Sequence, residues 1–149
     1  MRVMVDTNVA LRAVTTPGVI GPEEVGQALA AITMKGYSLS ISGQTVVELW
    51  AVMTRPKAAN GLEMEPLRAR QEIDTIMGLF DIVADPPELL TTWLDLCTRY
   101  QVRGRQVFDA KIVALMLACE MTQLVTLNPT DFRRFTEIEL LVPGEAASR

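Results

Sequence analysis

The order of short apolar segments and amphipathic helical segments restricts this chain to few folds. Five short segments rich in Val, Ile and Leu alternate with stretches whose apolar residues recur every three to four positions. Strands joined through helices favour a parallel sheet with helices on both faces. We therefore predict a three-layer α/β/α domain with a central, mostly parallel sheet of about five strands. The predicted strands are 2–5, 38–41, 80–84, 123–126 and 138–142, and the predicted helices are 22–35, 42–53, 66–79, 88–100 and 107–121. Ser42 is the expected N-cap of helix 42–53.

The length of 149 residues fits one compact domain, and no repeat or linker divides the chain. We predict a single domain over 1–149, with a Pro- and Gly-containing loop at 17–22. No apolar run reaches the roughly 18 residues that a membrane span needs, and the first residues read as a strand rather than a secretory leader. We therefore expect a cytoplasmic protein without a membrane-bound form.

The chain contains no histidine. This excludes Ser-His-Asp and Cys-His triads, His-based acid–base catalysis and zinc sites with His ligands. The formal net charge of −4 argues against a protein that coats nucleic acid, although it does not exclude a nuclease whose acidic site holds metal. Any catalysis therefore depends on carboxylates, metal ions, Lys, Tyr, Ser or Thr.

Acidic residues lie at the edges of four apolar segments. Asp6 ends the first predicted strand, Glu48 lies in the helix after the second, Asp109 lies in the first turn of the last helix, and Asp131 follows the fourth strand. Parallel sheets bind ligands beyond the carboxyl ends of their strands, so we expect these segments to converge. Clustered carboxylates bind hard divalent cations and suggest phosphodiester chemistry. Ordinary roles, as Asx turns, helix caps or solvated helix residues, remain open for each acid.

Several motifs occur in a characteristic order along the chain. A resemblance to the PIN-domain nucleases, and among them to the VapC-type toxins of type II toxin–antitoxin systems, covers essentially the whole sequence. The motifs are Asp-Thr-Asn-Val at 6–9, Val-Glu-Leu-Trp at 47–50, Met-Thr-Arg-Pro at 53–56, Asn-Gly-Leu at 60–62, Val-Phe-Asp-Ala-Lys at 107–111 and Val-Thr-Leu-Asn-Pro-Thr-Asp-Phe at 125–132.

The resemblance implies an endoribonuclease that depends on Mg²⁺, with Mn²⁺ as a substitute ion, and that a VapB-like antitoxin neutralises. It also implies a homodimer. Asp6 and Asp109 match the metal-ligating aspartates of the family, and Glu48 matches its third acidic residue. Thr7 or Asn8 would give polar support beside Asp6.

The chain departs from the family pattern at two positions. The fourth acidic position corresponds to Asn128, with Asp131 three residues later, and both are candidate catalytic residues. Asp131 either supplies the missing carboxylate or only caps the next turn. An Asn can bind Mg²⁺ through its carbonyl oxygen but adds no charge. Phe108 stands directly before Asp109, where relatives often carry a His.

The expected binding surfaces are less sharply defined. We expect the RNA path to follow basic residues that flank the acidic motifs. The family resemblance implies an apolar groove for the antitoxin that includes Trp50, Met53 and Leu62. The apolar stripe of helix 42–53, however, favours a core position for Trp50. The candidate phosphate contacts are Arg12, Arg55, Lys57, Arg103, Arg105, Lys111, Arg133 and Arg134.

Two alternative functions are considered. The Asn at 128 motivates a catalytically inactive PIN-like domain that binds RNA or protein. A receiver-type signalling domain also has an acidic magnesium pocket, but it needs a Lys after its last strand, and none follows 138–142.

Overall fold

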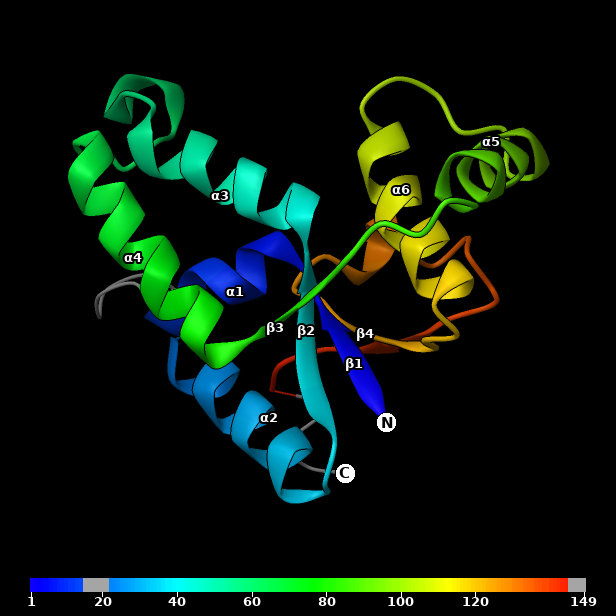
Figure 1. Ribbon diagram of the computed structural model, residues 1–149, viewed down its shortest axis with the longest axis horizontal. Helices are drawn as coiled ribbons and strands as arrows, with labels where there is room; N and C mark the ends of the chain where they lie inside the picture. The colour runs from blue at the N-terminus through cyan, green and yellow to red at the C-terminus, as the bar shows by residue number, and fades with distance from the viewer. Residues whose placement is uncertain (15–21, 145–149) are drawn as a thin grey trace.

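A five-stranded parallel sheet forms the centre of the domain (Figure 1). The computed structural model describes residues 1–14 and 22–144, so the loop predicted at 17–22 lies outside the described residues except for Pro22. Within the described ranges the strand order is β3-β2-β1-β4-β5, and every neighbouring pair is parallel. The predicted parallel α/β sheet is confirmed. The strands are β1 (Arg2–Val5), β2 (Ser38–Ser42), β3 (Asp81–Val83), β4 (Gln123–Val125) and β5 (Glu139–Leu141).

The helices form a layer on each side of this sheet: α1 to α4 pack on one side, and α5 and α6 on the other (Figure 1). None of the described helices is both long and apolar enough to cross a membrane. The helices are α1 (Thr7–Val14), α2 (Pro22–Met34), α3 (Gly43–Thr54), α4 (Pro66–Leu79), α5 (Leu89–Arg99) and α6 (Gln106–Ala118), with short 3₁₀ turns η1 (Lys57–Ala59) and η2 (Pro129–Asp131).

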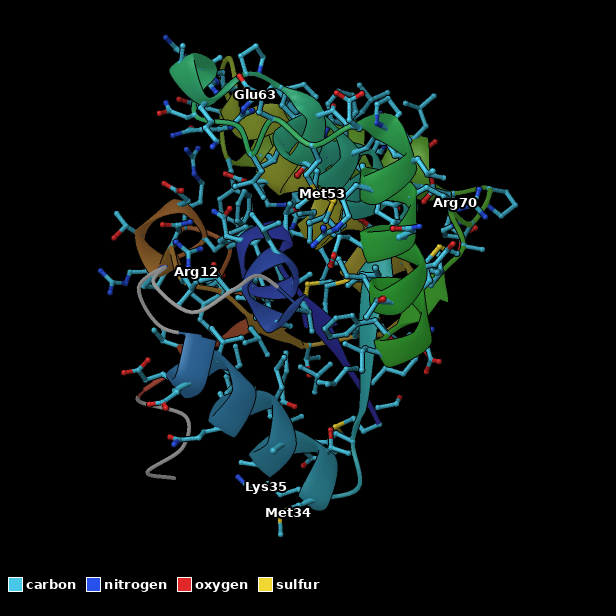
Figure 2. The ribbon with its side chains drawn as sticks, turned by 90° about the vertical axis from the view of Figure 1, so that its left-hand side faces the viewer. Arg12, Met34, Lys35, Met53, Glu63 and Arg70 are labelled. Atoms are coloured by element: carbon cyan, nitrogen blue, oxygen red, sulfur yellow. The ribbon has the colours of Figure 1, made fainter. Side chains whose placement is uncertain are left out.

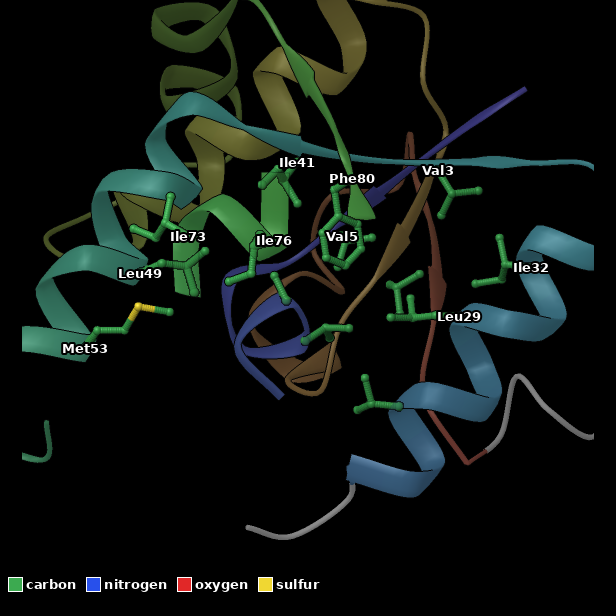
Figure 3. Packing of buried hydrophobic residues seen from close by; sticks show 14 of the residues in the cluster. Val3, Val5, Leu29, Ile32, Ile41, Leu49, Met53, Ile73, Ile76 and Phe80 are labelled. Carbon is green, nitrogen blue, oxygen red and sulfur yellow. The ribbon is translucent and has the colours of Figure 1, made fainter. Parts of the chain in front are cut away.

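Strand β1 contributes to both cores because successive side chains of a strand point to opposite faces. Val3 and Val5 pack among α1 to α4, in the cluster that Figure 3 shows with Leu49, Ile76 and other residues of these helices. Met4 points the other way and packs among α5 and α6. A strand buried on both faces reads as a continuous apolar run, as Val-Met-Val does here.

Helix α1 is the element that the sequence did not predict. The Asp6 carbonyl accepts hydrogen bonds from the Val9 and Ala10 amides, so the helix begins directly after β1. Its first residues, Thr-Asn-Val, are weak helix formers, and the helix has only eight residues. Val9 and Ala10 are fully buried, so packing against the neighbouring helices stabilises a segment that would not be helical alone.

Helix α3 confirms its predicted cap and, except for Trp50, its predicted apolar face. The Ser42 side chain accepts a hydrogen bond from the Thr45 amide, as expected for an N-cap. Leu49 and Met53 are buried, so Met53 cannot line a binding groove (Figures 2 and 3). Trp50 is 38% exposed, so its predicted core position is wrong. It lies beside Arg70, which projects from α4 at the side of the domain in Figure 2.

The turn between α3 and α4 explains the glycine of the Asn-Gly-Leu motif. Asn60 adopts the left-handed conformation, with φ of 61°. A Cβ atom at Gly61 would lie 2.0 Å from the Arg55 carbonyl oxygen, so only glycine fits. The Arg55 side chain donates to the Asn60 carbonyl, which ties this predicted phosphate contact to the turn.

Candidate active site

Asp6 is held at the carboxyl end of the central strand. Strand β1 pairs with β4 so that Val5 faces Val125, and the Asp6 amide continues this ladder by donating to the Val125 carbonyl over 3.0 Å. The register brings Asp6 beside Thr126, whose hydroxyl donates to Asp6 Oδ2 over 3.0 Å. The Thr7 amide donates to Oδ1 over 2.8 Å. The carboxylate is therefore buried, oriented and hydrogen-bonded on both oxygens.

Glu48 reaches the same edge from the second turn of α3. The Thr7 hydroxyl donates to Glu48 Oε2 over 2.7 Å, and the Gln44 amide donates to Oε1 over 2.7 Å. Gln44 and Glu48 lie four residues apart, the spacing at which helical side chains meet. Thr7 therefore contacts both acids, with its amide on Asp6 and its hydroxyl on Glu48.

Asp109 and Asp131 complete an acidic cavity. Glu48, Asp109 and Asp131 line a cavity of about 510 Å³ together with Arg105, Gln106 and Phe108. Asp109 lies in the first turn of α6, and Asp131 ends η2 just after β4. Among the described residues, neither carboxylate receives a hydrogen bond from the protein, in contrast to those of Asp6 and Glu48.

The electrostatics show that the four acids act on one another. Burial is the largest cause that raises the pKa of Asp109, to about 6, and the charges of Asp6, Asp131 and Glu48 raise it further. Burial also raises the pKa of Asp6, against the lowering effect of its hydrogen bonds from Thr126 and Thr7. Among the described residues, Arg134 lowers the pKa of Asp109, as the smallest of the causes. The site therefore carries uncompensated negative charge.

Asn128 and Asp131 are placed differently, although both follow β4. The Asn128 amide donates to the Thr126 hydroxyl over 3.0 Å, and Asn128 is not among the residues that line the acidic cavity. Asp131 lines the cavity and raises the pKa of both Asp6 and Asp109. The 3₁₀ turn that begins at Pro129 moves the chain back towards the site, which the sequence spacing alone did not indicate.

Comparison with known proteins identifies the family. The family model described as PIN domain matches residues 3–138, a range that contains all four acids. The chain belongs to the PIN domain family. No curated protein matches it in sequence. PIN domains are in general nucleases that use a divalent metal ion, so the acidic edge of this PIN domain is its candidate active site.

Solved structures share the fold of this PIN domain at low sequence identity. VapBC2 of Rickettsia felis, bound to a promoter DNA fragment, matches with a TM-score of 0.75 and 19% identity, over 95% of this chain and 98% of that one. VapBC-1 of nontypeable Haemophilus influenzae matches with a TM-score of 0.71 and 15% identity, over 97% and 99%. A toxin–antitoxin complex of Klebsiella pneumoniae matches with a TM-score of 0.64 and 20% identity, over 95% and 97%. These likenesses establish the fold.

The donor set of the PIN domain fits a hard divalent cation. Among the described residues, no group of three or more His, Cys, Asp or Glu side chains is already arranged to hold a metal ion. Mg²⁺ does not require such a cage, because it usually binds one or two carboxylates and keeps several waters. Among the described residues, no hydrogen-bond donor contacts the carboxylates of Asp109 and Asp131, which line the acidic cavity. The pKa of Asp109 is raised first by burial and further by the charges of Asp6, Asp131 and Glu48, and a bound cation would offset these charges.

Two supporting residues were not predicted as part of the site. Thr126 is fully buried and orients Asp6, and Gln44 orients Glu48. The i,i+4 spacing of Gln44 and Glu48 was visible in the sequence. The contact between Thr126 and Asp6 spans 120 positions and depends on the pairing of β1 with β4, so no local signal pointed to it.

Proposed function

We propose that this PIN domain is a VapC-type toxin, a cytoplasmic endoribonuclease that depends on Mg²⁺ or Mn²⁺. The observation that carries the proposal is the convergence of Asp6, Glu48, Asp109 and Asp131, from four separate segments, at one edge of the sheet. Three of these acids line a single cavity, and the fourth, Asp6, interacts electrostatically with Asp109. The chain contains no histidine, so His-based acid–base catalysis is excluded and the clustered carboxylates are the candidate catalytic groups of this edge.

The four acids form the metal-binding part of the proposed site, and neighbouring polar residues hold them in place. Asp6, Asp109 and Glu48 would hold the metal, and Asp131 supplies the fourth carboxylate in place of Asn128. A bound divalent cation would offset the negative charge on a phosphate oxygen of the RNA and lower the pKa of a water molecule bound to the cation. Thr7 and Gln44 hold Glu48 in place, and Thr126 holds Asp6. Arg105 lines the cavity and is the basic side chain best placed to contact the RNA backbone.

The proposed inhibitor is a VapB-like antitoxin. The matched structures include VapBC proteins and a toxin–antitoxin complex, which supports a partner of this kind. Exposed apolar side chains of α3 and α4, with Val47 69% and Met77 48% exposed, border a cavity of about 460 Å³ that also includes Trp50. Apolar surface of this kind marks partner sites. We assign this surface to the antitoxin, and we propose a homodimer as the assembled toxin.

RNA cleavage tests the proposed activity. Wild type, Asp6→Asn and Asp109→Asn are compared on structured and unstructured RNAs with Mg²⁺ or Mn²⁺, and Asp95→Asn, at an exposed position on α5, is the matched control. We expect wild type and Asp95→Asn to cleave and both site variants to lose cleavage. Equal cleavage by all four proteins would contradict the proposed site.

The second candidate function is an RNA- or protein-binding module without activity. Asn128 at the family's fourth acidic position and the lack of a preassembled group of three metal ligands among the described residues favour it. Absence of cleavage by every protein, together with RNA binding by wild type, would support this function instead.

A further inference from the structure

A second cavity lies next to the acidic one. Its volume is about 500 Å³, within the range of small-molecule sites. Its walls are mainly apolar and aromatic, in contrast to those of the acidic cavity. The lining residues that matter for the argument are Gln44, Asp85, Leu90, Trp93, Phe108 and Lys111.

Two residues connect this second cavity with the acidic cavity. Phe108 lines both. Gln44 lines the second cavity and donates to Glu48 Oε1 over 2.7 Å. On α6, Phe108 and Lys111 lie three residues apart and share a face, while Asp109 lies on the adjacent face towards the acids. Ligands in the two cavities would therefore share Phe108 as a common wall.

One of the two aromatic walls, Trp93, is held in place before a ligand arrives. Trp93 comes from α5, and its indole N–H donates to the Val107 carbonyl over 2.9 Å. This bond satisfies the polar atom of the ring and fixes its position against α6. Phe108, which lines both cavities, is 57% exposed. Much of its side chain is therefore accessible to a ligand.

The polar groups of the second cavity distinguish its ligand from a phosphate. Asp85 and Lys111 carry opposite charges, so together they add no net charge to the lining. They offer one acceptor and one set of donors, which matches the mixed donor and acceptor edge of a nucleobase. A purely apolar partner would leave both charges without compensation when they are buried.

We propose that this second cavity binds an unpaired nucleobase of the nucleotide next to the cleaved bond, with Phe108 and Trp93 as its aromatic walls. The inference rests on the proposed function, since it takes RNA as the ligand. Aromatic residues that stack single-stranded bases act without strong sequence preference, whereas Asp85 and Lys111 would read the edge of the base. The second cavity would thus contribute to the choice of cleavage position.

Binding without cleavage tests this proposal. Fluorescence anisotropy in EDTA compares a short labelled RNA with copies in which one nucleotide at a time is abasic. For wild type we expect one position at which loss of the base weakens binding by roughly 5- to 150-fold. Phe108→Leu should bind the intact RNA more weakly and should lose the sensitivity at that position. Leu67→Ala, at an exposed apolar position on α4, is the control that should behave as wild type.

A second readout reports on Trp93 directly. In Trp50→Phe, Trp93 is the remaining tryptophan, and stacking of a base should quench its fluorescence on addition of the intact RNA. The proposal is overturned if Phe108→Leu binds intact and abasic RNAs as wild type does. It is also overturned if Phe108→Leu changes the mass in sedimentation equilibrium while RNA binding stays the same, since a second copy of the chain then occupies the cavity. Failure of the proposed cleavage would leave the base dependence in EDTA intact, so the two failures are distinguishable.

Discussion

Replacing Asp109 by Asn should stabilise the metal-free protein while it removes the proposed activity. The pKa of Asp109 is raised from 3.8 to about 6, first by burial and then by Asp6, Asp131 and Glu48. The folded state therefore holds this proton more tightly than the unfolded state, and ionised Asp109 destabilises the fold. Asn removes the charge at nearly the same size. The carboxylate receives no hydrogen bond from the described residues, so the change breaks none there.

The magnitude follows from the difference between the two pKa values. At about 1.4 kcal/mol per pKa unit, a difference of about 2 corresponds to roughly 3 kcal/mol. Asp109 is partly exposed, and solvent screening reduces this to about 1.5 kcal/mol. Loss of a negative charge in the first turn of α6 costs about 0.5 kcal/mol. The expected net gain is about 1 kcal/mol at pH 7.5, or roughly 2–4 °C in the melting temperature.

The pH dependence distinguishes this cause from other effects of the substitution. The destabilisation of wild type is absent below pH 3.8, grows between about pH 4 and 6, and is fully present above the folded-state pKa. Urea unfolding in EDTA at pH 4.5, 6 and 7.5 should therefore show a difference between variant and wild type that increases with pH. Asp95→Asn is the control, and it should show no such trend. A difference that is independent of pH, or a variant less stable than wild type at pH 7.5, would refute the reasoning.

Three further changes have defined outcomes. Millimolar Mg²⁺ or Mn²⁺ should raise the melting temperature of wild type, because a cation that binds the folded state relieves the repulsion among the acids; an unchanged value in scanning fluorimetry would count against a metal site. Asp131→Ala should lower metal-dependent RNA cleavage by at least roughly tenfold, as expected for a residue that supports a metal site, whereas Asn128→Ala should cleave at close to the wild-type rate. The opposite ranking would assign the fourth position to Asn128. Gln44→Met keeps the helix but removes the donor to Glu48, so Mn²⁺ affinity in titration calorimetry should fall by roughly 10- to 100-fold. An unchanged affinity would show that Gln44 does not support metal binding.

The sequence predicted the elements whose signals are local. Helix 66–79 was predicted at its observed bounds because Pro66 begins it and its apolar residues follow the helical period. The Ser42 cap was also predicted, because its bond to the Thr45 amide joins residues three positions apart. Helix α1 was missed because it has only eight residues and begins with weak helix formers, and burial of Val9 and Ala10 stabilises it.

The candidate site also combines features that the local sequence predicts with features that depend on tertiary packing. The sequence by itself determined which acids are available, since its motifs and lack of histidine left the carboxylates as the candidate groups. Only the tertiary structure decided how they are held: the register of β1 and β4 places Thr126 on Asp6, and the turn after Asn128 brings Asp131 into the cavity. These contacts join residues far apart in the chain. Their geometry depends on strand pairing and packing, which no short segment of sequence encodes.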